Sequence, residues 1–96
     1  MALGKQKMKT ITKKIDKEWL DMIISGKKKF ELRAADFEIE DGDTIRLEEW
    51  TNDKVRKFTG RFIEKKATYV RKIDLKSWIN RQPELLKNGL YIIQFE

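Results

Sequence analysis

The chain has 96 residues, of which 40% are hydrophobic and 40% are charged, and its formal net charge is +6. This length favours one domain with a modest core, and the composition is typical of a soluble globular protein. The absence of cysteine and histidine excludes disulfides, a Ser-His-Asp triad and thiolate or histidine metal sites. No run approaches about 18 apolar residues, so a transmembrane helix is excluded. The absence of cysteine makes a reducing cytoplasm the expected location. Residues 1–9 are predicted to form a flexible tail and residues 10–96 a single domain.

Charge is unevenly distributed along the chain. Counted from the sequence, residues 1–33 carry a net charge of +6, residues 34–53 carry −7 and residues 54–96 carry +7. If the two basic segments meet on one face, that face will attract phosphate, although lysine-rich surfaces also serve simply to keep small proteins in solution. The spacing of the acidic residues does not match an EF-hand loop, so we expect no metal site.

The first predicted elements are a strand over residues 10–14 and a helix over residues 17–25. Asp16 is a candidate N-cap for this helix, and Gly26 suits a left-handed residue at its end. We expect its apolar stripe to lie in the core; the stripe consists of Trp19, Leu20, Ile23 and Ile24.

A strand with strict alternation follows the helix. We expect its apolar residues to face the core and its charged residues to face solvent; they are Phe30, Leu32 and Ala34, and Lys29, Glu31 and Arg33 respectively. Further strands are predicted over residues 44–50, 55–73 and 90–95, with a break or bulge at Gly60. Asp74 is the candidate N-cap of a second helix. This order of elements is α+β, with a small curled sheet or barrel.

The stretch GKKKFELR, directly after the first predicted helix, resembles the hallmark of the ASCH superfamily, named for activating signal cointegrator homology. The hallmark Gly-x-Lys-x-x-Glu-x-Arg corresponds to Gly26, Lys28, Glu31 and Arg33. The chain is most similar to an uncharacterised ASCH-like family of bacterial and phage domains. The features of that family recur in order at Lys14, Asp36, Gly42-Asp43, Thr59-Gly60-Arg61, Lys66–Val70 and Gly89–Phe95. Members often carry a histidine near the first strand, which this chain lacks. The resemblance implies a small PUA-like β-barrel flanked by about two helices, with a cleft between them.

The resemblance also implies binding of single-stranded or modified RNA, or of a nucleotide. We expect no cofactor and a monomer. The nucleic-acid-binding candidates are Lys28, Glu31, Arg33, Arg61, Lys66 and Tyr69. Lysine and arginine contact phosphate, a carboxylate accepts hydrogen bonds from a base amino group, and tyrosine stacks on bases. The plain structural alternatives are an exposed surface lysine at position 28 and a cross-strand salt bridge between positions 31 and 33. Four other aromatic residues are expected in the core: Trp19, Phe58, Phe62 and Trp78.

Two other function classes stay open on the sequence. The protein could be a small enzyme acting on a nucleoside or on RNA, with Lys28 as electrophile or general acid and Glu31 as base. Related amidohydrolases have a threonine where this chain has Glu31, which argues against their particular chemistry. Alternatively, the protein could be a protein-interaction domain whose contact face is the acidic segment 34–53.

Overall fold

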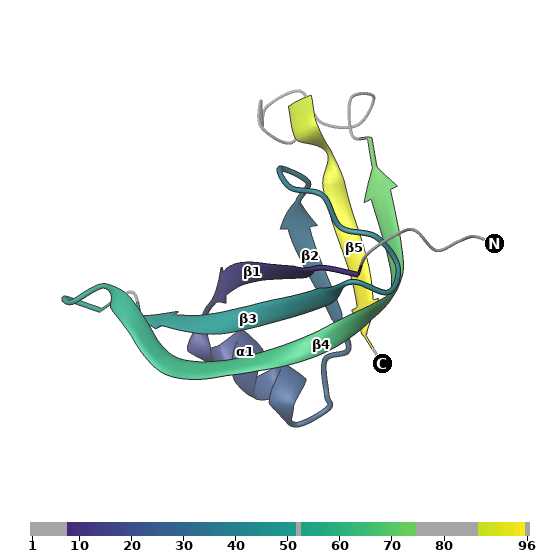
Figure 1. The fold of residues 1–96 in the computed structure, drawn as a ribbon. Coiled ribbons are helices and arrows are strands. Elements are labelled where there is room, and N and C mark those ends of the chain that lie inside the picture. The colour runs from purple at the N-terminus through teal and green to yellow at the C-terminus, as the bar shows by residue number, and fades with distance from the viewer. Residues whose placement is uncertain (1–7, 52, 75–86, 96) are drawn as a thin grey trace.

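The computed structural model describes residues 8–51, 53–74 and 87–95 (Figure 1). This part of the chain is α+β, as predicted, and contains five strands and one complete helix. The elements are β1 (Thr10–Ile15), α1 (Lys17–Ile24), β2 (Phe30–Ala34), β3 (Thr44–Thr51), β4 (Lys57–Ile73) and β5 (Leu90–Phe95). The second helix expected after Asp74, Trp78 and most of the expected tail lie outside the described residues. No helix in the described part is both long and apolar enough to span a bilayer.

The five strands form one sheet in the order β1-β3-β4-β5-β2, in which β1 and β3 are parallel and the other neighbours are antiparallel. β4 serves two half-sheets, because Lys57–Lys66 pairs with β3 and Ala67–Ile73 pairs with β5. Figure 1 shows the two halves running roughly across one another. Among the described strands, β1 and β2 remain unpaired edges, so the predicted closure into a barrel is not confirmed. The Arg33 guanidinium instead links these edges, donating from Nη2 to the Lys14 carbonyl oxygen over 2.8 Å.

Two irregularities shape β4. Gly60 has a φ of +94°, and three residues around it face the single residue Glu49, because Glu48 pairs with Phe62 and Trp50 pairs with Phe58. The predicted bulge at Gly60 is therefore confirmed, and its left-handed backbone explains the glycine. A second register shift falls between Ala67 and Tyr69, where the pairing with β5 begins.

The core lies on the inner face of the sheet, and α1 contributes only two residues to it. Leu20 and Ile23 are 0% and 1% exposed, whereas Trp19 is 43% exposed and Ile24 is 50% exposed. The prediction that Trp19 lies in the core is therefore wrong. A helix of two turns contacts the sheet along one narrow line of positions three apart, and its flanking residues project past the contact.

The two faces of β2 are the reverse of the prediction. Phe30 and Leu32 are 49% and 54% exposed, while Glu31 is only 4% exposed. The pairing register explains the reversal, because Glu31 lies opposite the fully buried Ile93 of β5 and therefore shares its face. The expected burial of Phe58 and Phe62 is also wrong, since both are about half exposed on the first half of β4.

Candidate functional site

A pocket of about 860 Å³ lies where the free edges of β1 and β2 face one another beside the start of α1. We call it the β1–β2 pocket. Its lining combines cationic and aromatic side chains with a few carboxylates. The main lining residues are Lys13, Lys14, Asp16, Trp19, Lys28, Phe30, Glu31, Arg33, Asp36, Trp50 and Arg56. The candidate residues Lys28, Glu31 and Arg33 thus come together in a recess.

Glu31 forms the anchor of this recess. Its carboxylate accepts from Lys28 Nζ at 3.2 Å on Oε1 and from Arg33 Nη1 on Oε2. The side chains of Lys28 and Arg33 are themselves only 16% and 24% exposed. Because a buried carboxylate is unfavourable without partners, the two cations stabilise Glu31, and Glu31 in turn fixes both cations at the pocket. The arrangement is more than a solvent-exposed salt bridge.

Aromatic rings flank the cations of the pocket. Lys28 Nζ lies 4.9 Å from the ring centroid of Trp19 and 5.4 Å from that of Phe30. Lys14 Nζ lies 4.5 Å from the ring centroid of Trp50. These distances are typical of cation–π interactions. The interactions place two ammonium groups beside aromatic rings that are still partly exposed to solvent. The sequence pattern predicts Trp19 and Phe30 in the core, so their position at the site was not expected.

The other three nucleic-acid-binding candidates lie outside this pocket. Lys66 and Tyr69 are exposed on β4. Arg61 is engaged in ion pairs, with Nη2 at 2.6 Å from Asp21 Oδ1 and 2.9 Å from Glu49 Oε2. These carboxylates raise the pKa of Arg61 further, and the guanidinium lowers the pKa of Glu49. Arg61 therefore fastens α1 to the β3–β4 hairpin.

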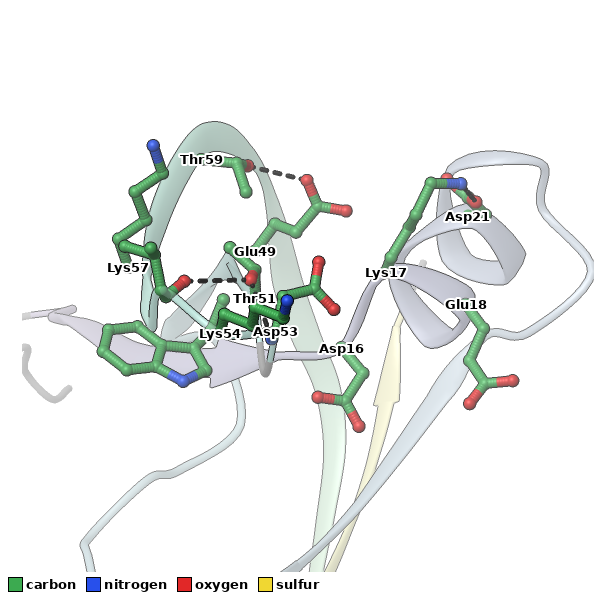
Figure 2. Close-up of a pocket in the computed structure, with 12 residues that line it drawn as sticks. Asp16, Lys17, Glu18, Asp21, Glu49, Thr51, Asp53, Lys54, Lys57 and Thr59 are labelled. Atoms are coloured by element: carbon green, nitrogen blue, oxygen red, sulfur yellow. Dashed lines mark hydrogen bonds and ion pairs between the residues drawn. The ribbon is translucent and has the colours of Figure 1, made fainter.

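The Gly60 bulge builds this fastening. Because the bulge places residues 59–61 opposite Glu49, the two residues that flank the glycine both reach its carboxylate. Thr59 Oγ1 donates to Glu49 Oε1 over 2.6 Å, and Arg61 Nε donates to the same oxygen over 3.2 Å. Figure 2 shows the bond between Thr59 and Glu49 on the wall of a neighbouring pocket. The Thr-Gly-Arg motif thus has a structural role in holding the hairpin against α1.

This neighbouring pocket, of about 1300 Å³, has the opposite electrostatic character (Figure 2). We call it the acidic pocket. Its carboxylates outnumber its lysines; they are Asp16, Glu18, Asp21, Glu49 and Asp53, against Lys17, Lys54 and Lys57. It shares Asp16 and Trp50 with the β1–β2 pocket. The described residues contain no group of three or more carboxylates arranged to hold a metal ion.

Three of the eight carboxylates in the acidic segment 34–53, those of Asp43, Glu48 and Glu49, are engaged within the fold. Asp43 is 4% exposed and accepts from the backbone N–H groups of Lys9 and Glu40 at 3.1 and 2.9 Å. Burial disfavours its charged form, but these bonds outweigh that effect and lower the pKa of Asp43. Glu48 pairs with Arg46 at 2.7 Å. The other five carboxylates of the segment are exposed.

Comparison with known proteins places the chain in a family. Residues 11–79 match the family described as Domain of unknown function (DUF3850), and the chain belongs to this family. It is 38% identical over 66 residues to an uncharacterized 12.9 kDa protein in the GpA 3' region of Escherichia phage P2. That match covers 69% of this chain and 56% of the phage protein, so it spans little more than half of the relative. The fold is similar to that of hypothetical protein PH0355, with a TM-score of 0.63 at 19% identity over 93% of this chain and 98% of that one.

Proposed function

We propose that this member of the DUF3850 family binds single-stranded RNA or a nucleotide in the β1–β2 pocket. The observation that carries the proposal is the position of Lys28, which is ion-paired to the buried Glu31 and lies beside the rings of Trp19 and Phe30. Cationic groups next to partly exposed aromatic faces are what a nucleotide requires, because its phosphate is anionic and its base stacks.

Each part of the ligand has a candidate partner. Lys14, Lys28 and Arg56 supply positive charge for the phosphate at the pocket wall. Trp19 and Phe30 offer partly exposed rings on which a base can stack. Glu31 already accepts one bond on each carboxylate oxygen, and each oxygen has a further lone pair for a base amino group.

The resemblance to the ASCH superfamily supports the same assignment. The hallmark residues Lys28, Glu31 and Arg33 all line the pocket. We therefore extend the proposal to membership of that superfamily, with its PUA-like architecture and with a role as a cytoplasmic RNA-binding module. The open edges of β1 and β2 would then correspond to the cleft that the superfamily resemblance implies.

At the β1–β2 pocket the geometry favours binding over catalysis. Both oxygens of Glu31 accept bonds from cations, so its evident role is to position Lys28 and Arg33, which binding requires and general-base catalysis does not. For a protein-interaction face on the segment 34–53, Asp43, Glu48 and Glu49 are already engaged within the fold, whereas the other five carboxylates are exposed and would serve such a face.

A salt titration with matched lysine variants tests the proposal. Binding of short RNA is followed by tryptophan fluorescence, because Trp19 and Trp50 line the pocket. If two or three phosphates are contacted, affinity should fall about 7- to 20-fold between 50 and 200 mM salt. Lys28→Ala should weaken binding about tenfold or more. Lys27→Ala is the matched control, since this neighbouring lysine is exposed and does not line the pocket.

Two results would reject the proposal. Equal effects of Lys28→Ala and Lys27→Ala would show that the lysine run attracts RNA only by its overall charge. Failure of the wild-type protein to bind RNA or nucleotides at low salt would remove the proposed function altogether. Turnover of RNA that is lost in Glu31→Gln would favour the enzyme instead.

A further inference from the structure

The outer face of the half-sheet formed by β2, β5 and the second half of β4 carries a row of exposed side chains that leads away from the pocket. Phe30 of β2 lies opposite Gln94 of β5, and Gln94 lies opposite Tyr69 of β4. Phe30 is 49% exposed and Tyr69 is 48% exposed. Since neighbouring strands are about 4.8 Å apart, the two aromatic positions are separated by about 10 Å across the sheet.

The register shift in β4 creates this row. Ala67, which is buried, pairs with the buried Phe95, and the next regular pair is Tyr69 with Gln94. If β4 paired regularly here, Thr68 would lie opposite Gln94 and Tyr69 opposite the buried Ile93, so Tyr69 would face the core. Thr68 also fixes the middle of the row, because Gln94 Nε2 donates to Thr68 Oγ1 over 3.1 Å.

Among the described residues, this face is mostly apolar and has no carboxylate that would repel a polyanion. In the described residues of the three strands, the outward positions carry one cation and no carboxylate. They are Phe30, Leu32 and Ala34 on β2, Leu90, Ile92 and Gln94 on β5, and Tyr69, Arg71 and Ile73 on β4. Arg71 pairs with Ile92, so it lies on the same face in the row adjacent to that of Tyr69. The exposed Lys66 precedes the register shift on the same strand. Aromatic rings on an antiparallel sheet with nearby cations are a known way to stack two or three successive RNA bases.

The two surfaces that adjoin the β1–β2 pocket, the exposed row and the acidic pocket, determine along which path an RNA strand can leave it. Phe30 belongs both to the pocket lining and to the exposed row, so the two surfaces are continuous. On the other side, the pocket adjoins the acidic pocket through Asp16 and Trp50, and the carboxylates drawn in Figure 2 would repel phosphate there. A bound strand therefore leaves over Phe30 rather than over Asp53.

We propose that a single RNA strand extends from the β1–β2 pocket across Phe30, Gln94 and Tyr69, so that the site takes about three nucleotides rather than one. This inference rests on the proposed function. Tyr69 is the outer stacking platform, and Arg71 contacts the phosphate beside it.

The experiment measures affinity against ligand length. Uridine and adenosine 5'-monophosphates and the corresponding oligonucleotides of two to six residues are titrated into the protein at 50 mM salt. Affinity should rise from one to about three nucleotides and then level off. In Tyr69→Ala the trinucleotide should lose about tenfold in affinity, so that most of the length dependence disappears. Tyr69→Phe, which keeps the aromatic ring, should retain the length dependence.

Phe62→Ala is the matched control. This aromatic residue is also on β4 and 46% exposed, but it lies before the register shift and pairs with β3. It should leave the length dependence intact. Mononucleotide binding without any gain in affinity for longer RNA would overturn the inference and leave the proposed function standing. A length dependence that survives Tyr69→Ala would also overturn it, and absence of all binding would overturn both proposals.

Discussion

Glu31→Gln tests whether the charged cluster in the β1–β2 pocket stabilises the fold. Glutamine keeps the shape of the side chain and one acceptor oxygen, but its NH₂ group must face one of the two cations. One charge-assisted hydrogen bond is then lost and the other is weakened. Such bonds contribute about 1.5–3 kcal/mol each.

Two effects reduce the net cost below that of a fully buried ion pair, which is about 3–5 kcal/mol when one partner is removed. The variant no longer buries a carboxylate, and the side chains of Lys28 and Arg33, at 16% and 24% exposed, can be partly hydrated. We expect Glu31→Gln to lower the free energy of unfolding by about 2 kcal/mol. With a urea m-value of about 1.5 kcal/mol/M, the midpoint should fall by about 1.3 M.

Urea unfolding followed by tryptophan fluorescence measures this shift. Asp36→Asn is the matched control, because Asp36 pairs with Lys13 at 3.8 Å and its side chain is 60% exposed. Exposed pairs of this kind contribute about 0–1 kcal/mol, which corresponds to a midpoint shift of about 0.7 M or less. If Glu31→Gln shifts the midpoint no more than Asp36→Asn does, the reasoning about burial at the pocket is refuted.

Three further predictions concern the rest of the fold. Gly89→Ala should destabilise the fold far more than Gly60→Ala, although both glycines have a positive φ. A Cβ at position 89 would lie 2.6 Å from a backbone oxygen, whereas nothing lies within 4 Å of one at position 60, where the cost is about 1–2 kcal/mol. Equal urea midpoints for the two variants would contradict this. The folded pKa of Asp43 lies below its ordinary 3.8, so its contribution is present above that pH and is lost as pH falls through the folded pKa; Asp43→Asn should flatten the acid limb of a stability–pH curve, and an unchanged limb would refute the assignment. Arg61→Ala should speed amide exchange in α1, unlike the exposed Lys57→Ala, and equal exchange would argue against the fastening.

The sequence predicts the elements well because their ends depend on local chemistry. Asp16 precedes the helix and Gly26 follows it with a φ of +83°, as the positions of these residues suggest. The Asp16 carboxylate makes no capping hydrogen bond, however, so its place at the helix start reflects backbone geometry rather than the predicted side-chain bond. Gly60 likewise marks its bulge, because a positive φ is favourable for glycine alone.

The side on which a residue lies depends on partners far away in the sequence, and there the predictions fail. Alternation in β2 separates two faces but does not say which one is covered. The pairing of Glu31 with the buried Ile93 decides it, and the cluster of opposite charges makes the burial tolerable. The sequence therefore indicates Lys28, Glu31 and Arg33 as a group, but it misses the rings of Trp19 and Phe30 beside them. It also offers no sign that Arg61 is bound to two carboxylates.

The extra residue in β4 at Thr68 has a consequence for how this family can vary. A regular strand exchanges its buried and exposed sides downstream whenever one residue is inserted or deleted. At Thr68 the backbone already accommodates one residue outside the alternation, so a loss there would leave Val70 covered and Tyr69 uncovered. We therefore expect relatives that are one residue shorter at this point to keep the same inside and outside, whereas a change of length elsewhere in the strand would exchange them.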